Sequence, residues 1–555
     1  MTDNSRRTSD GVLVQAGILA AASMIVRIVG LLYRAPLTAI IGDEGNGYYG
    51  TAYNIYTIIL MVSSYSIPSA ISKLIAQKRA VGEYKNAHRV FLCAVLYGLG
   101  VGFLGSALLY FGAGALVPAV AVPVLRVFAP TIIFFGILAA LRGYFQGHGS
   151  MVQTSVSQIL EQLANAVVSI GAAALLIRIA AAHGADTTKK AQMGASGSAL
   201  GTGAGVLTAL VFMAFCYFQG RGKIRRSLLE DQTGRLDTYG HILKETVLVI
   251  TPFMLSGFIL NLTTSLNQTI YYKIMINLRG MDETLATTLY GIFSNKAVVI
   301  SNIPISIATA VSSAIIPGIS ASFAKGDLED TKRRVTNATR ITAMIAIPSF
   351  VGLLTLARPV TMLMFPQMES LPMAALLLSL LSITVVFYSI STITNAALQS
   401  IGKMSMPLVS AGIALIVQTA ALCLILVTTN ADIYALVIVS VLYSFMIFIV
   451  NELFLKKYLG IRRDLKILFI RPLLCAAVMG AAAWMVYHAV CLLVSAAGLH
   501  RAYFVNLAGT AAGLLIAVIV YFFLLIMSHT MTEENLRSLP KGEKIVRLLR
   551  KIKWL

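Results

Sequence analysis

The sequence has few charged residues for its length. Only 12% of its 555 residues are Asp, Glu, Lys or Arg, and 57% are hydrophobic, whereas a soluble domain carries about 25% charged residues. This shortage of charge excludes an ordinary soluble protein. It indicates a multi-pass protein of the cell (cytoplasmic) membrane.

Motifs for common enzymatic and cofactor chemistry are also missing. The five cysteines lie in apolar stretches without the spacing of metal ligands, and the seven histidines are scattered. No Gly-x-x-x-x-Gly-Lys-Ser/Thr loop is present, so nothing indicates ATP hydrolysis by this chain. We therefore expect no enzyme, no metal site and no cofactor, and we expect any transport to be driven by membrane potential or an ion gradient.

Long apolar runs dominate what is present. A membrane-spanning helix needs about 20 apolar residues, and fourteen runs reach that length. They lie at residues 13–41, 47–75, 87–115, 121–145, 152–180, 193–218, 242–272, 285–323, 335–357, 370–400, 404–428, 432–456, 466–496 and 502–528. We predict an all-α polytopic membrane protein with 14 transmembrane helices. In the sixth run, Gly197, Gly201 and Gly205 predict close packing of that helix against a neighbour.

The positive charge is concentrated in alternate connections between these runs. The net charge is +21, from 44 Lys and Arg against 23 Asp and Glu, which in a soluble protein would suggest a nucleic-acid partner. Here the basic clusters alternate with connections poor in cations, apart from Lys189 and Lys190, as the positive-inside rule predicts. The basic clusters lie at residues 6–7, 73–89, 221–226, 332–334 and 456–466. We therefore expect no nucleic-acid partner, and we expect both termini in the cytoplasm.

Two weak repeats divide the predicted helices into lobes. Residues 67–72 resemble residues 316–320, and residues 146–151 resemble residues 399–404, at a common offset of about 250 residues. An even number of spans between equivalent segments indicates parallel repeats related by a pseudo-twofold axis along the membrane normal. The predicted parts are an N-terminal lobe of six spans (1–218), a cytoplasmic basic linker (219–241), a C-terminal lobe of six spans (242–456), two peripheral spans (457–528) and a cytoplasmic tail (529–555).

The tail is basic and amphipathic. Residues 543–555, EKIVRLLRKIKWL, interleave large apolar side chains with lysines and arginines. Such a segment lies along an anionic membrane surface with its apolar face buried. We expect the tail to act as an anchor, with anionic membrane lipids as its partners.

Two arginines lie inside the first apolar run. Arg27 and Arg34 are seven residues apart, which is about two helical turns, so both lie on nearly the same face, roughly 10 Å apart along the axis. An ionisable residue at membrane depth marks a substrate or ion path by default, and arginine binds phosphate through its bidentate fork. The alternative is that Arg34 extends to the outer interface and Arg27 pairs with a buried carbonyl.

Three further charged residues lie in other apolar runs. Lys296 is a third candidate cation for substrate binding. Glu161 could take up a proton or pair with a cation, and Glu161 and Arg142 form a candidate coupling or cavity pair, although for Arg142 extension to the interface is favoured. Because the cations outnumber the acid, a central cavity would suit a polyanion such as a pyrophosphate.

Three segments resemble a known family. LLYRAPLTAIIGDEGNGYYGTAYNIY (31–56), SQILEQ (157–162) and AIIPGISASFAKGD (314–327) are similar to the polysaccharide-export branch of the multidrug/oligosaccharidyl-lipid/polysaccharide (MOP) exporter superfamily. That branch contains MurJ-type lipid II flippases and the stage V sporulation protein B group, and the resemblance covers nearly the whole chain. It implies two six-helix lobes around a cavity that opens alternately to each side, and a peripheral helix pair beside a groove for lipid tails.

The resemblance also bears on the candidate residues. The cavity arginines of the family fall on Arg27 and Arg34, and an arginine of its eighth span falls on Lys296. Two departures concern the headgroup: the second span has no cation before Lys73, and residues 164–165 are Ala-Asn, where this branch often has arginine.

These observations predict a flippase rather than an enzyme. The resemblance implies an undecaprenyl-pyrophosphate-linked sugar as substrate, with the peptidoglycan precursor lipid II first, and with another lipid-linked polysaccharide or a sporulation-specific cortex precursor as alternatives. A cation-coupled multidrug exporter is disfavoured because such exporters favour buried acids. A non-transporting scaffold for envelope assembly would not need a cationic cavity. Cell-wall synthesis proteins are the expected protein partners.

Cysteine labelling tests the predicted orientation. Single cysteines in the linker (219–241) and in the tail (529–555) should react with a membrane-impermeant maleimide only after the membrane is permeabilised, because the basic connections stay inside. A cysteine in the 181–192 connection, predicted to be outside, is the positive control. Labelling of the linker or the tail in intact cells would contradict the predicted topology.

Overall fold

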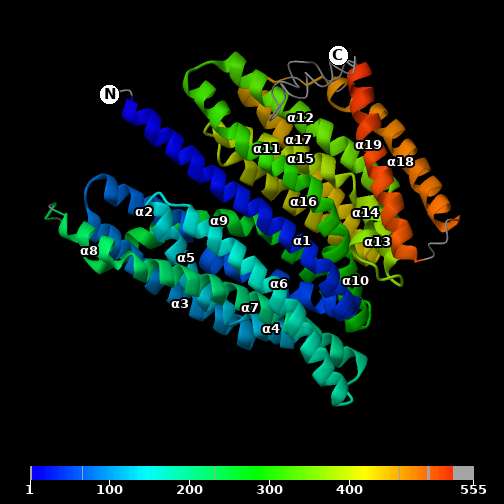
Figure 1. Ribbon diagram of the computed structural model, residues 1–555, viewed down its shortest axis with the longest axis horizontal. Helices are drawn as coiled ribbons and strands as arrows, with labels where there is room; N and C mark the ends of the chain where they lie inside the picture. Colours follow the sequence, from blue (N-terminus) through cyan, green and yellow to red (C-terminus); the bar gives the residue numbers. More distant parts are fainter. Residues whose placement is uncertain are drawn as a thin grey trace. The chain divides into compact units, whose positions relative to one another are not determined.

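The structure consists of helices. The computed structural model describes residues 3–65, 67–231, 233–234, 236–461, 463–464, 466–496 and 501–528, and these residues contain no strand. Packing divides the chain into two compact units, Met1–Gly291 and Ile292–Leu555, whose helices are drawn in Figure 1. The predicted all-α class is confirmed, and the predicted tail (529–555) lies outside the described residues.

Most of the predicted spans have a matching helix. Among the described residues, 11 helices are long and apolar enough to cross a membrane, or 12 if Leu371–Leu381 and Thr384–Ser400, bent by 44°, form one span. A further helix, Tyr239–Tyr272, covers the predicted span 242–272. The count of 14 stays a prediction with which these helices are compatible.

The first helix is interrupted at a glycine. The helix α1 runs over Asp3–Leu60, and its 58 residues would reach about 87 Å if continuous, far beyond the roughly 30 Å hydrocarbon core. At Gly42 the backbone has φ 71° and ψ −179°, a conformation that glycine adopts without steric cost. The break falls between the predicted spans 13–41 and 47–75, so α1 covers the first span and begins the second.

The rest of unit 1 packs around α1. A π-helical turn (Met61–Tyr65) joins α1 to α2, and the helices that follow are α2 (Ile67–Ala80), α3 (Tyr84–Leu116), α4 (Val122–Phe128), α5 (Thr131–Gly147), α6 (Val152–Ala182), α7 (Thr187–Gln219), α8 (Arg221–Leu229), α9 (Tyr239–Tyr272) and α10 (Glu283–Gly291). Their shared core is made mainly of buried apolar side chains from α1, α2, α3, α4, α5, α7 and α9.

Small residues let helices of unit 1 approach backbone to backbone. A Cβ at Gly197 would lie 2.6 Å from the backbone of Ala172, and one at Gly201 would lie 2.0 Å from Ser169 Oγ. Ser169 Oγ also donates a 3.0 Å hydrogen bond to the carbonyl of Ser198. The close packing predicted from the glycine spacing is therefore confirmed, and its partner is α6.

Unit 1 includes helices from beyond the predicted linker. The helix α10 touches α1 so closely that a Cβ at Gly47 would lie 2.4 Å from the carbonyl oxygen of Thr287. Thr51 Oγ1 lies 2.5 Å from the hydroxyl of Tyr272 in α9. The boundary between the units thus lies at Gly291, whereas the predicted lobes part at residues 219–241; the lobes, which rest on sequence repeats, stay a prediction.

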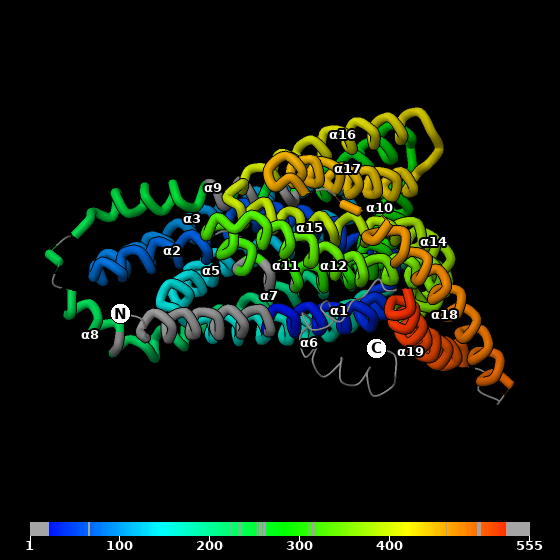
Figure 2. The backbone as a smooth tube through the Cα atoms, turned by 90° about the horizontal axis from the view of Figure 1, so that it is seen from above, coloured from blue at the N-terminus to red at the C-terminus, as the bar shows by residue number. Residues whose placement is uncertain are grey.

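Unit 2 continues the chain with nine α-helices in its described part. They are α11 (Val298–Ala324), α12 (Leu328–Thr355), α13 (Ala357–Met364), α14 (Leu371–Leu381), α15 (Thr384–Ser400), α16 (Met406–Thr428), α17 (Tyr434–Leu459), α18 (Arg471–Ala496) and α19 (Ala502–Met527). The helices α16 and α17 pack side by side, as do α18 and α19 (Figure 2). The pair α18 and α19 packs on α12 through a core that includes Val351, Met479 and Leu525.

Candidate functional site

The two arginines of α1 differ in burial. Arg27 is exposed and Arg34 is half-buried. Neither forms an ion pair within the described part of the chain. Both are thus cations in an apolar helix that no carboxylate neutralises among the described residues.

Arg34 lies beside a row of aromatic side chains on the second part of α1. Its charge interacts electrostatically with Tyr49 and Tyr53, whose rings stack at 5.6 Å. Tyr56 continues the row and stacks on Phe128 of α4 at 4.7 Å. The row provides hydroxyl groups and ring faces next to the arginine, which are groups that hydrogen-bond or stack on a polar ligand.

Glu161 and Arg142 form an ion pair. Arg142 Nη2 donates to Glu161 Oε2 at 2.7 Å, and Arg142 Nε donates to Ser157 Oγ at 3.0 Å. Only 7% of the arginine side chain and 24% of the glutamate side chain are exposed. The sequence favoured extension of Arg142 to the interface, and this prediction is wrong. Its counterion on α6, Glu161, holds it inside unit 1.

Tyr53 connects these two groups. It interacts electrostatically with Arg34 and also with Glu161. The half-buried arginine of α1 and the Arg142–Glu161 pair thus lie on either side of one tyrosine. The three charges leave a net charge of +1 around it.

The row of tyrosines was not among the residues predicted from the sequence. Tyr49, Tyr53 and Tyr56 follow at spacings of four and three residues, which places them on one helical face, so the signal was present in the sequence. The contacts of Asn54 carry no such signal. Its amide donates to Gln268 Oε1 at 2.7 Å and to the Tyr290 hydroxyl at 3.2 Å, across more than 200 residues of chain.

Lys296 lies in the interior of unit 2. It is 1% exposed and belongs to a π-helical turn, Ile292–Ala297, that precedes α11. Its Nζ donates to Ser370 Oγ at 2.8 Å and lies 5.9 Å from the centre of the Phe365 ring. Arg27 and Arg34 belong to unit 1, and the predicted arrangement of all three cations around one cavity stays a prediction.

Unit 2 also contains an apolar groove between α12 and α18. Its volume is about 800 Å³, and its walls include Phe350, Leu354, Trp484 and Met485. The helices approach closely at Gly480, where a Cβ would lie 2.7 Å from Val351 Cγ1. An apolar groove of this size fits a hydrocarbon chain better than a polar group.

The described titratable residues do not gather into a metal site. Among the residues that the structure describes, no three or more His, Cys, Asp and Glu side chains are grouped so that they could hold a metal ion. The chemistry that the arrangement offers is binding: fixed positive charge, hydroxyl groups and ring faces in unit 1, and an apolar groove in unit 2.

Comparison with protein families identifies two matches. The model of the family described as "Polysaccharide biosynthesis protein" matches residues 12–323, more than half of the chain. The model of the MatE family matches residues 262–425. The resemblance to the MOP superfamily that was found in the sequence is confirmed by these matches.

Individual relatives agree with the family. The chain is 24% identical over 417 residues to the lipid II flippase MurJ of Bacillus subtilis (strain 168), which covers 72% of this chain and 75% of that protein. It is 26% identical over 331 residues to the stage V sporulation protein B of the same organism, which covers 58% and 61%. A solved structure of a lipid II flippase MurJ in an inward closed conformation is similar with a TM-score of 0.62 and 14% identity, covering 91% of this chain and 98% of that one; this likeness shows the fold.

Removing the counterion of Arg142 should destabilise the protein. Glu161→Ala leaves a buried arginine without its partner, and we expect a loss of about 3 kcal/mol in the free energy of unfolding. Chemical unfolding of the purified protein in detergent, followed by circular dichroism, measures this. Glu329→Ala is the matched control, because Glu329 pairs with Lys332 but its side chain is 85% exposed, so it should cost less than about 1 kcal/mol. Equal losses for the two variants would show that the buried pair contributes no more than a surface pair.

Proposed function

The chain belongs to the polysaccharide biosynthesis protein family, and we propose that it is a flippase that moves an undecaprenyl-pyrophosphate-linked sugar across the cell membrane. Lipid II, the peptidoglycan precursor, is the first candidate substrate. Another lipid-linked polysaccharide and a sporulation-specific cortex precursor are the alternatives, since the chain is similar to the lipid II flippase MurJ and to the stage V sporulation protein B.

The arginines of α1 are the observation that carries the proposal. A guanidinium group inside an apolar helix is costly, yet neither Arg27 nor Arg34 has a carboxylate partner among the described residues. Such a cost is sustained where a ligand supplies the opposite charge. A pyrophosphate supplies at least two negative charges and pairs of oxygen atoms that can accept two hydrogen bonds from the arginine fork.

The apolar groove fits the other part of the same substrate. An undecaprenyl chain is a hydrocarbon that must stay out of water while its headgroup crosses. The groove between α12 and α18 offers apolar walls such as Leu354 and Met485, so the tail can stay beside unit 2 while the headgroup moves.

The ion pair disfavours a multidrug exporter. A carboxylate that binds a cationic drug must be free to accept it, but Glu161 is already hydrogen-bonded to Arg142 at 2.7 Å. A cationic drug would have to displace an arginine that is held by Ser157 as well. The same pair argues against Glu161 as the site that couples transport to an ion.

The contact of α1 with α10 is a candidate gate. Gly47 and Gly291 bring the two backbones together, and a Cβ at Gly291 would lie 2.5 Å from Gly47 Cα. Under the predicted lobes, α1 and α10 come from different halves of the repeat. Alternating access then requires this contact to open. While the two backbones touch at these glycines, no substrate could pass between α1 and α10.

We propose that membrane potential or an ion gradient drives the transport. Moving one elementary charge across 100 mV is worth about 2.3 kcal/mol, which biases two states by more than tenfold. Flipping of a labelled lipid-linked sugar in vesicles that contain the purified protein should therefore stop when potential and ion gradients are both dissipated. Flipping that survives this treatment yet needs ATP would contradict the proposal.

Complementation tests the role of the arginines. In cells depleted of their own flippase, Arg27→Ala and Arg34→Ala should each fail to restore growth at normal membrane levels. Losing one charge-assisted contact costs on the order of 1.5–3 kcal/mol, or roughly ten- to a hundredfold in binding. Arg27→Lys should restore growth in part, because a point charge replaces a fork.

The control for this test is Lys456→Ala, which removes an exposed cation at the end of α17 and should support normal growth. Membrane levels of each variant are checked by immunoblot. Wild-type growth of the Arg27→Ala/Arg34→Ala double variant would remove the main support for an anionic substrate. The lipid-linked precursor that accumulates when the protein is depleted from its host identifies the sugar.

A further inference from the structure

A second pocket with polar side chains lies at the end of unit 1, where α2 turns into α3. Its volume is about 180 Å³, and side chains of α2, α3, α5, α7 and α8 line it. A cavity needs only about 15 Å³ of such space to hold one water, so a phosphate group fits. The basic clusters at residues 73–89 and 221–226 predict that this end of the unit faces the cytoplasm.

The lining carries one fixed positive charge, that of Arg79. It also includes His88 and His148, and no Asp or Glu is among the described residues that line it. Arg79 Nε and His88 Nδ1 are buried without a hydrogen-bond partner among the described residues. Buried polar groups in native proteins are almost always satisfied, and an unsatisfied one often marks a bound water or ion. Two unsatisfied nitrogen atoms in one cationic pocket indicate an anion.

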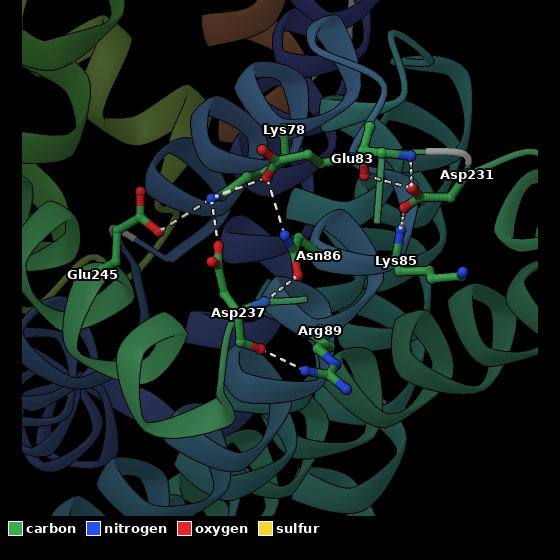
Figure 3. A network of polar contacts seen from close by, with 9 residues as sticks. Lys78, Glu83, Lys85, Asn86, Arg89, Asp231, Asp237 and Glu245 are labelled. Atoms are coloured by element: carbon green, nitrogen blue, oxygen red, sulfur yellow. Dashed lines mark hydrogen bonds and ion pairs between the residues drawn. The ribbon is translucent and has the colours of Figure 1, made fainter. Parts of the chain in front are cut away.

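Carboxylates near the pocket contact Lys78 instead of Arg79. Figure 3 shows that Lys78, the residue before Arg79, points into a network of its own. Its Nζ contacts Glu83 at 3.2 Å, Asp237 at 2.9 Å and Glu245 at 3.9 Å. Three acids thus surround one lysine, while the adjacent arginine lines a pocket with no acid among its described residues.

The same network binds the linker to the α2–α3 turn. Asn86 donates to Glu83 and accepts from the backbone N–H of Asp237, both at 3.0 Å. The backbone N–H of Lys85 donates to Asp231 at 2.7 Å. Hydrogen bonds from Thr233 and from that backbone N–H hold the pKa of the Asp231 carboxyl below its ordinary value. These carboxylates cannot turn toward Arg79 without breaking the attachment.

The charge of Arg79 acts on His148. His148 is open to solvent on one side, and its ring lies 4.2 Å from that of Tyr144. Desolvation lowers the pKa of His148 below its ordinary value, and the nearby charges of Arg79 and His88 lower it further. An anion between these side chains would relieve that repulsion.

We propose that this pocket binds a phosphate group, either free inorganic phosphate or the headgroup of an anionic phospholipid. The Arg79 guanidinium supplies charged N–H donors, and the His88 ring supplies a further N–H donor. The hydroxyls of Tyr84 and Ser227 add two more hydrogen-bond donors to the lining. Phe145 provides an apolar wall for the part of a lipid next to its phosphate. Basic pockets between helices on the cytoplasmic side bind anionic headgroups in other membrane proteins. This site is separate from the arginines of α1.

Native mass spectrometry of the full-length protein in a neutral detergent tests the proposal. Three probes are added at equal concentrations: phosphatidylglycerol, phosphatidylcholine and inorganic phosphate. We expect the wild type to retain one phosphatidylglycerol or one phosphate, and to prefer either of them over phosphatidylcholine. Retention of phosphatidylglycerol alone identifies a lipid site, and retention of inorganic phosphate as well identifies a site for the phosphate group itself.

Variants decide whether the pocket is responsible. Arg79→Gln should weaken binding of the anion roughly ten- to a hundredfold, the loss expected for one charge-assisted hydrogen bond. His88→Gln keeps a polar side chain and should weaken binding of the anion less. It serves as the second variant if Arg79→Gln does not fold. Lys73→Gln is the matched control, because it removes a cation from the exposed surface of the same helix. Equal loss with Lys73→Gln, or no preferred anion in the wild type, would overturn the proposal.

Discussion

The cost of charge inside a membrane is the constraint on which the rest of this structure depends. Every ionisable side chain in an apolar helix must be paired, satisfied by polar groups or used by a ligand. Arg142 shows the first solution, since Glu161 and Ser157 hold its guanidinium group. Lys296 shows the second, since its ammonium group binds the hydroxyl of Ser370 beside an aromatic ring. Arg27 and Arg34 have no carboxylate partner among the described residues, and this contrast is what gives them a functional meaning.

Close helix packing provides the frame that makes such selective pairing possible. In lipid, helices associate through van der Waals contact between small residues rather than through the hydrophobic effect. The contact of α6 with α7 at Gly201, of α1 with α10 at Gly47 and of α12 with α18 at Gly480 all bring a helix within reach of its neighbour's backbone or side chains. The first fixes the helix that carries Glu161. The last lies in the wall of the apolar groove, so the same packing rule serves both the polar and the apolar site.

At the end of unit 1 the cations serve two different roles. Lys78 is surrounded by carboxylates and attaches the linker to the α2–α3 turn. Arg79 follows directly in the sequence but lines a pocket in which the structure describes no Asp or Glu. Neighbouring residues on a helix point about 100° apart, so one basic cluster supplies a structural cation on one face and a ligand-binding cation on another.

The sequence by itself determined the class of the protein and the location of its helices. Hydropathy and the alternation of basic connections are read from the composition of each segment, without knowing which helices are neighbours. The sequence also identified Arg27, Arg34 and Lys296 as residues that need an explanation. It could have identified the face shared by Tyr49, Tyr53 and Tyr56, because helical periodicity is a local property.

Only the tertiary structure decided which side chains meet. The ion pair of Arg142 with Glu161 and the contacts of Asn54 with Gln268 and Tyr290 join different helices. A local sequence pattern does not indicate which helices become neighbours. Burial likewise depends on all the helices around a residue, and for that reason Arg142 lies inside unit 1 although its place near the end of an apolar run suggested extension to the interface. The packing of α10 on α1, and not the basic linker, set the boundary of unit 1, because a compact unit is defined by contacts in space rather than by composition along the chain.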